Sequence, residues 1–228
     1  ALGTDLKFVK NIGPILTRTN LDDENSIKHL DVSKVVAKLQ PVYEAIKLTK
    51  KHLSKEKDLV GFVGAPWTLF AYMIEGSGSK NFEKANLALV NQDKRSRELF
   101  DILIEAVSRH LVAQIDAGAT CVQIFDSWAG EIAMEKYDDF VIEPSRKIVE
   151  YVRSKHKDIP IIGFPRGSSF RYERYVEKTK VDILSVDQEV PLNWIKERLA
   201  DKAIIQGNLD PFTLLEGGEI MQKKTEEI

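Results

Sequence analysis

The sequence predicts an α/β fold, a TIM-type (β/α)8 barrel that is incomplete here, with roughly the central five βα units present. Short apolar strands alternate with helical segments along the 228 residues, which is typical of a parallel sheet with right-handed crossovers. No Gly-x-Gly-x-x-Gly turn follows a strand, so a dinucleotide-binding fold is not favoured. With 43% apolar residues, the chain is expected to form one domain over residues 1–228.

The opening of the chain, over residues 6–26, lacks the pattern of a barrel unit. Residues 6–9 and 15–17 flank a turn-rich stretch and are predicted to form a hairpin, and the polar run 20–26 is predicted to be a loop. Helical spacing begins near Ser33 and resumes after Pro41, which is expected to open a new helix. One side of that helix is predicted to carry Val42, Ile46 and Leu53.

The alternation of strands and helices begins at residue 58. An apolar strand over 58–63 is stopped by Gly64 and Pro66, and a glycine-punctuated loop that carries aromatic residues is expected to run on to Gly76. Apolar residues at a three-four spacing over 99–114 predict the clearest helix of the chain, and Gly118 is well placed to end it.

The second half continues the same pattern. Further strands are predicted over 120–126, 161–164, 183–187 and 203–206. Further helices are predicted over 137–156, interrupted or kinked at Pro144, and over 172–178, 192–200 and 220–228. Asp210 before Pro211 fits a helix N-cap, so Asn208, Asp210 and Pro211 are assigned a structural role.

Composition excludes several classes of function. Acidic and basic residues number 35 and 33, which leaves a formal charge of -2 and no field that favours nucleic acid. The one cysteine, Cys121, excludes an intrachain disulfide, and no Cys/His spacing suggests a metal site. The sequence has no apolar run long enough for a membrane span, so a soluble, cytoplasmic protein is expected.

Candidate site residues follow from the predicted topology. In a parallel barrel the loops after the strands gather at one face, so polar residues just beyond each apolar run are the candidates. This rule selects Tyr72, Ser127, Arg166, Asp187 and Asn208. No Ser/His/Asp arrangement and no phosphate-binding glycine loop is present in the sequence, so nucleophilic hydrolysis is not supported.

Four ordered segments carry a resemblance to a known family. The chain resembles uroporphyrinogen decarboxylases, which remove carboxyl groups from the acetate side chains of a tetrapyrrole. The matching segments are Gly61-Phe62-Val63-Gly64-Ala65-Pro66-Trp67-Thr68-Leu69-Phe70-Ala71-Tyr72-Met73-Ile74-Glu75-Gly76, Gln123-Ile124-Phe125-Asp126-Ser127-Trp128-Ala129-Gly130, Leu184-Ser185-Val186-Asp187 and Gln206-Gly207-Asn208-Leu209-Asp210-Pro211.

The resemblance implies roles for two polar candidates. It implies that Tyr72 points into the cavity and contacts the substrate, and that Ser127 donates its hydroxyl to a substrate carboxylate. Each also has a structural interpretation. Tyr72 falls at helical spacing and could be a core residue, and Ser127 follows Asp126 at a strand end, where either residue commonly caps a turn or helix.

The remaining candidates also keep two interpretations. The resemblance implies that the rings of Phe62 and Phe125 line the cavity floor, whereas apolar strand residues are core residues by default. Arg166 stands where the family often carries a lysine, and it could hold a carboxylate or cover the rim. Asp187 is a site candidate because it follows a predicted strand, but it could equally brace the mouth of the barrel.

The resemblance also implies an activity. It is the stepwise decarboxylation of four acetates, from uroporphyrinogen III to coproporphyrinogen III in porphyrin and haem biosynthesis. The family is thought to use protonation of the electron-rich pyrrole as its electron sink, so no cofactor and no metal is expected. The implied partners are a tetrapyrrole substrate and a second copy of the chain in a homodimer, with neither nucleic acid nor membrane.

The resemblance covers about the middle two-thirds of a typical member, so truncation at both ends is expected. In the family an aspartate that contacts the pyrrole NH groups lies a few residues before an Ala-Leu-Gly segment, and this chain begins Ala1-Leu2-Gly3. The catalytic aspartate is therefore expected upstream of Ala1, and the 228 residues alone are expected to be inactive.

Two other functions remain open. Zinc-dependent, corrinoid-linked methyltransferases share a similar barrel and some sequence character, but they need a His/Cys ligand set. Cys121 has no histidine nearby in the sequence. A non-catalytic tetrapyrrole-binding protein would keep the pocket without turnover.

Overall fold

The structure is a computed structural model that describes residues 1–3, 6–10, 13–16, 19, 23, 25–91 and 94–228. Within these residues, five parallel strands form one sheet in the order β3-β4-β5-β6-β7. The elements follow one another as β1 (Leu6–Val9), β2 (Gly13–Leu16), η1 (Val32–Lys34), α1 (Val35–Lys38), α2 (Gln40–His52), β3 (Val60–Gly64), α3 (Pro66–Glu75), α4 (Glu83–Val90), α5 (Lys94–Asp116), β4 (Cys121–Asp126), η2 (Ala129–Glu131), η3 (Met134–Lys136), η4 (Asp138–Ile142), α6 (Glu143–Lys155), β5 (Ile161–Pro165), α7 (Arg171–Thr179), β6 (Ile183–Ser185), α8 (Leu192–Arg198), β7 (Ile204–Gln206), α9 (Pro211–Glu216) and α10 (Gly218–Glu227).

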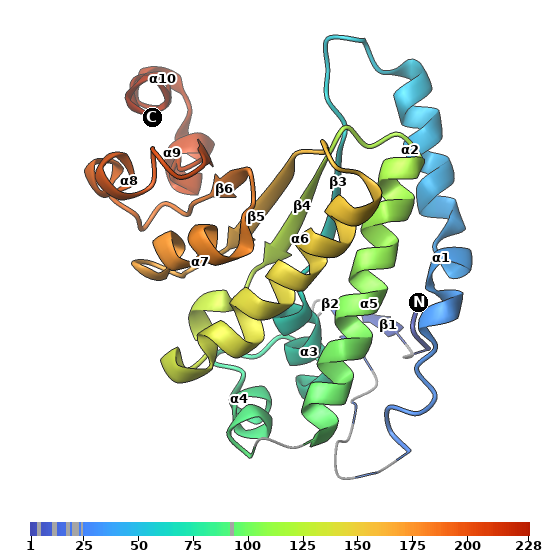
Figure 1. The fold of residues 1–228 in the computed structure, drawn as a ribbon. Helices are drawn as coiled ribbons and strands as arrows, with labels where there is room; N and C mark the ends of the chain where they lie inside the picture. Colours follow the sequence, from blue (N-terminus) through green and yellow to red (C-terminus); the bar gives the residue numbers. More distant parts are fainter. Residues whose placement is uncertain (4–5, 11–12, 17–18, 20–22, 24, 92–93) are drawn as a thin grey trace.

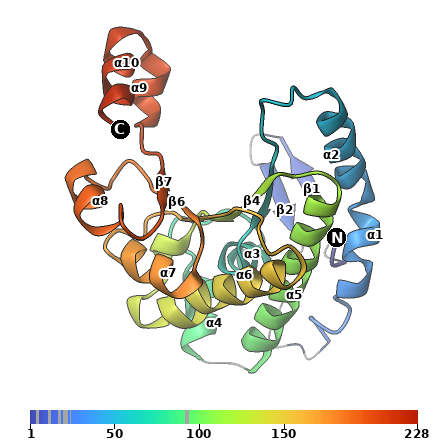
Figure 2. The same cartoon turned by 45° about the horizontal axis from the view of Figure 1, so that its top comes forward.

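The strands occur in the sheet in their order along the chain, with helices between them, which confirms the predicted barrel-type α/β fold. The five described strands do not close on one another, so the barrel is open between β3 and β7. Helices α5 and α6 lie along one face of the sheet (Figure 1). In Figure 2, α9 and α10 extend from the end of β7, away from α5 and α6.

The two faces of the sheet differ in burial. Val122 and Ile124 on β4 point toward the helices and are completely buried. On the other face, the side chains of Val60 and Phe62 are 44% and 63% exposed, and Ile204 on β7 is 67% exposed. The period of two along each strand thus places one set of residues against the helices and another on the face that corresponds to the interior of a barrel. That face is exposed at the edge strands and buried at Gln123 and Ile162 near the middle of the sheet.

The outer edge of β3 is bonded to a helix side chain. The Phe62 N–H donates to the Gln114 Oε1 at 3.0 Å, and the Gln114 Nε2 donates to the Phe62 carbonyl at 3.0 Å. The Leu59 carbonyl accepts from the Thr120 N–H, and the Ala65 N–H donates to the Phe125 carbonyl, so odd-numbered residues of this strand bond toward β4. The backbone groups of Phe62, an even-numbered residue, therefore face away from β4. Gln114 on α5 therefore satisfies both backbone groups of Phe62 at this edge.

The segment after β3 differs from its prediction. A loop was expected from Gly64 to Gly76, but the structure has helix α3, with Pro66 in its first turn and Gly76 left-handed at its end (φ 81°). The helix is buried on most sides, with Trp67 and Phe70 completely buried. A helix that is apolar all round has no amphipathic period, which is why the pattern was not recognised.

The helical predictions are confirmed in part. The interruption at Pro144 is present, because a π-helical turn (η4) precedes α6 and Pro144 lies in the first turn of α6. The predicted side of α2 is confirmed in part, because Ile46 and Leu53 are partly buried but Val42 is not. Val42 is 39% exposed, whereas Tyr43 is buried and its hydroxyl lies 2.9 Å from the His110 Nδ1 on α5, which sets the rotation of the helix.

The N-terminal hairpin is confirmed, since β1 and β2 pair antiparallel with Leu6 opposite Leu16. The Leu16 N–H donates to the Gly76 carbonyl at 2.8 Å, which attaches the hairpin to the end of α3. Thr17 and most of the predicted loop 20–26 lie outside the described residues. None of the helices in the described ranges is both long enough and apolar enough to cross a membrane.

Candidate functional site

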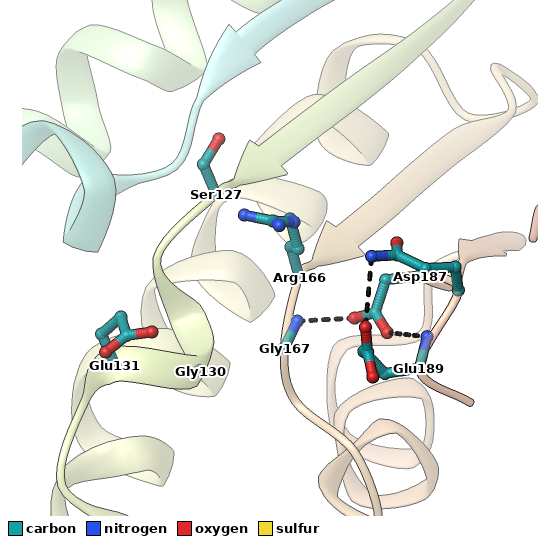
Figure 3. A pocket seen from close by; sticks show the side chains of 8 residues that line it. Ser127, Gly130, Glu131, Arg166, Gly167, Asp187 and Glu189 are labelled. Carbon is teal, nitrogen blue, oxygen red and sulfur yellow. Dashed lines mark hydrogen bonds between the residues drawn. The ribbon is translucent and has the colours of Figure 1, made fainter. Parts of the chain in front are cut away.

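A pocket of about 130 Å³ lies where the carboxyl ends of β4, β5 and β6 meet (Figure 3). This is the edge at which barrel enzymes place their functional residues. Three of the predicted candidates line it, namely Ser127, Arg166 and Asp187, and they are joined there by Gly130, Glu131, Gly167, Gln188 and Glu189.

Two loops are held against each other at the pocket. The Arg166 N–H donates to the Asp126 carbonyl at 3.0 Å, and the Gly130 N–H donates to the Arg166 carbonyl at 2.9 Å. A Cβ on Gly130 would lie only 2.8 Å from the Gly167 carbonyl oxygen, so the backbones can approach only without a side chain there. The loop after β4 and the loop after β5 thus form one unit.

Ser127 and Arg166 offer hydrogen-bond donors that the fold does not use. In the described part of the chain, neither the Ser127 hydroxyl nor the Arg166 guanidinium has a side-chain hydrogen bond or an ion pair. The Arg166 guanidinium extends toward the end of β4 that carries Ser127 (Figure 3). A neutral hydroxyl beside a guanidinium is suited to an anion such as a carboxylate.

Asp187 is bonded as a brace. Its Oδ2 accepts from the Gly167 N–H and from the Tyr172 hydroxyl, each at 2.7 Å, and its Oδ1 accepts from the Glu189 N–H at 3.1 Å. Burial, reinforced by the hydrogen bond to Asp187, raises the pKa of the Tyr172 hydroxyl above its usual value. The carboxylate oxygens of Asp187 are thus engaged in holding the loop after β5.

Asn208 also holds this region together. Its Nδ2 donates to the Asp187 carbonyl at 2.9 Å and to the Val190 carbonyl at 2.7 Å, so its amide links the segment after β7 to the loop after β6. Asp210 accepts from the N–H groups of Phe212 and Thr213, which confirms the predicted N-cap of α9.

Tyr72 is not among the residues that line this pocket. It is partly buried on α3, where its ring makes edge contacts with Phe82 and Trp128, at centroid distances of 6.1 and 6.4 Å. Trp128 follows Ser127 directly, so Tyr72 lies beside the loop that carries the serine.

The predicted aromatic residues form a row across the sheet. The rings of Phe62 and Phe125 meet edge to face at 5.9 Å, and Phe125 meets Phe164 in the same way at 5.9 Å. The default interpretation of Phe62 as a core residue is wrong, because its side chain is 63% exposed on the open face of the sheet. The row presents an apolar surface that extends over β3, β4 and β5.

Asp126 is the functional candidate that sequence reasoning missed. It was interpreted as a cap, but its side chain is 1% exposed and its Oδ1 accepts from the Thr68 hydroxyl at 2.7 Å. Its Oδ2 has no hydrogen-bond partner in the described residues. Burial raises the pKa of this carboxyl to about 7, although the Thr68 hydrogen bond acts in the opposite direction.

No group of three or more His, Cys, Asp or Glu side chains among the described residues is arranged to hold a metal ion. Cys121 lies at the start of β4, the end opposite to Ser127, and burial raises the pKa of its thiol.

A family model described as uroporphyrinogen decarboxylase (URO-D) matches residues 1–228. The chain belongs to the uroporphyrinogen decarboxylase family. It is 40% identical over 228 residues to a uroporphyrinogen decarboxylase of Rickettsia conorii, and 41% identical to one of Chelativorans sp.. Both matches cover 100% of this chain, but only 65% and 66% of the respective relatives, so it spans about two thirds of their length.

Among solved structures, a methyltransferase from Methanosarcina mazei is similar to this member of the family, with a TM-score of 0.68 and 19% sequence identity. The similarity covers 95% of this chain and 63% of the methyltransferase chain. At this level of identity the comparison supports the fold, which agrees with the open barrel of parallel strands.

Proposed function

We propose that the protein decarboxylates uroporphyrinogen III to coproporphyrinogen III, removing the carboxyl groups of four acetates in turn. Membership of the uroporphyrinogen decarboxylase family supports this proposal. The observation that carries it in the structure is the position of two unused donors, Ser127 and Arg166, at the strand ends near the row of Phe62, Phe125 and Phe164.

The proposed substrate matches this arrangement chemically. A uroporphyrinogen has an apolar centre and a rim of eight carboxylates. The three phenylalanine rings offer an apolar surface for the centre, and the hydroxyl and guanidinium offer charge-assisted hydrogen bonds for a carboxylate. A pocket of about 130 Å³ is small beside the roughly 300–1,000 Å³ of sites that enclose whole ligands, so it suits a single side arm.

The reaction itself needs an electron sink, which the substrate can supply. Protonation of a pyrrole carbon gives a cationic ring, which accepts the electron pair of the breaking C–C bond as carbon dioxide leaves. The side-chain carbon then takes up a proton to become a methyl group, and the ring loses the proton it had gained. The protein's part in this proposal is to bind the carboxylates and orient one acetate at a time.

An anaerobic assay tests the proposal. The protein expressed from its natural gene is incubated with uroporphyrinogen III, and the products are oxidised and separated by their number of carboxyl groups. We expect seven-, six- and five-carboxyl intermediates to precede the four-carboxyl product. Retention of all eight carboxyl groups, with the porphyrin still bound, would favour a non-catalytic binding protein instead.

Removal of metal distinguishes the alternative of a zinc-dependent methyltransferase. Treatment with a chelator is expected to leave the rate of decarboxylation unchanged, whereas a zinc-dependent transfer to a thiol would stop.

We further propose that the protein acts in the cytoplasm, in haem biosynthesis, as a homodimer and without a cofactor. Sedimentation of the purified protein tests the dimer.

A further inference from the structure

Asp126 occupies the junction of the three elements that carry the polar candidates. Its backbone carbonyl accepts from the Arg166 N–H at 3.0 Å, and Ser127 follows it directly in the chain. Its side chain accepts from Thr68 on α3, which lies one helical turn before Tyr72. One residue is thus connected to all three of Tyr72, Ser127 and Arg166.

Helix α3 is fixed to the end of β4 by three hydrogen bonds. The Ala65 N–H donates to the Phe125 carbonyl at 2.7 Å, and the Trp67 indole N–H donates to the Trp128 carbonyl at 2.8 Å. The third bond, from the Thr68 hydroxyl to Asp126, is the only one of these three whose donor and acceptor are both side chains. It is therefore the bond that a conservative substitution can remove without altering the backbone.

The surroundings of Asp126 are apolar and phenolic. Tyr137, just before η4, and Tyr175 on α7 are buried, which raises the pKa of each hydroxyl, and an ionised Asp126 would raise it further. Thr68 is the neighbour from α3, and the Arg171 guanidinium lies 4.3 Å from the Tyr137 ring. No cation in the described residues pairs with the Asp126 carboxyl, so the neutral acid suits this position better than the ion.

We propose that Asp126 is a positioning residue that holds Tyr72, Ser127 and Arg166 in register through its carbonyl and its bond to Thr68. This inference rests on the proposed decarboxylase function. Loss of the side-chain bond should let α3 shift against β4, which changes the placement of Tyr72 relative to Ser127. Small displacements of substrate-binding groups can lower rates substantially.

The first test replaces Thr68 with valine, which removes the hydroxyl and keeps the shape. We expect kcat/KM for uroporphyrinogen III to fall about tenfold at a temperature where the variant is fully folded. Thr68→Ser restores the hydroxyl and should recover activity to within about twofold. Thr120→Val is the matched control, because Thr120 bonds to the Leu59 backbone at the opposite end of β4 and should leave kcat/KM unchanged.

The second test uses Asp126→Asn, which keeps an oxygen acceptor for Thr68 but cannot ionise. We expect kcat/KM of Asp126→Asn to fall less than that of Thr68→Val, because the side-chain oxygen of asparagine still accepts from the Thr68 hydroxyl. If the unsubstituted protein is active and Thr68→Val has the same kcat/KM as Thr120→Val, the inference is overturned. The proposed function would then still stand.

A structural readout decides the inference independently of turnover. In a crystal structure of Thr68→Val we expect Tyr72 to be displaced relative to Ser127 when β4 is superposed. Unchanged positions of both side chains would overturn the inference. Inactivity of the unsubstituted protein would instead contradict the proposed function, whatever that crystal structure shows.

Discussion

Replacing Asp126 with asparagine should make the free energy of unfolding depend less on pH. The pKa of the carboxyl in the folded chain, about 7, lies above its ordinary value of 3.8, so the folded state keeps the proton to higher pH than the unfolded chain does. The stability associated with this group is therefore fully present below about pH 4 and is lost as the pH rises to about 7. The shift corresponds to about 4 kcal/mol in total, of which about 2.5 kcal/mol falls between pH 5 and pH 7.5.

Urea unfolding followed by tryptophan fluorescence at pH 5 and at pH 7.5 measures this difference. The unsubstituted protein should lose about 2.5 kcal/mol more than Asp126→Asn over that range. Asp210→Asn is the control, because Asp210 is the N-cap of α9 and asparagine caps a helix about equally well, so this variant should follow the unsubstituted protein. Equal losses in the unsubstituted protein and Asp126→Asn would refute the reasoning that burial raises the pKa of Asp126 in the folded state.

Other substitutions separate binding from folding. Ser127→Ala should lower kcat/KM about tenfold in steady-state assays, because one hydrogen bond to a carboxylate is lost; an unchanged value would remove Ser127 from the site. Gly130→Ala should destabilise the fold by about 1–3 kcal/mol in urea, since its Cβ would meet the Gly167 carbonyl at 2.8 Å. Phe62→Ala should change stability by less than about 1 kcal/mol, because the ring is 63% exposed, yet weaken porphyrin binding in a fluorescence titration. Strong destabilisation by Phe62→Ala with unchanged binding would assign the ring to the core instead.

The strands, and the residues at their carboxyl ends where the site lies, could be predicted because apolar runs are a local feature of the sequence. Apolar runs placed β3 to β7 within two residues of their observed ends, and the rule for strand ends selected Ser127 and Arg166, which do lie together. The rule could not show that Asp187 is occupied as a brace, because two of its partners, Gly167 and Tyr172, lie 20 and 15 residues earlier in the chain.

The errors have a common physical cause, which is tertiary packing. Helix α3 is buried on most sides and so lacks the two-sided pattern from which helices are predicted. Tyr43 rather than Val42 is buried because its hydroxyl forms a hydrogen bond with the His110 Nδ1 on α5. The bond between Thr68 and Asp126 joins residues 58 positions apart, and a strand-end aspartate ordinarily indicates a cap.

Gln114 gives β3 a property that matters beyond the site. Exposed strand edges invite pairing with other chains, and proteins commonly block them with charges, prolines or bulges. Here a primary amide imitates one residue of a neighbouring strand, with its oxygen and nitrogen both bonded to Phe62. Any strand that paired with this edge would first have to displace Gln114 from a buried position, so the amide adds a cost to pairing at β3.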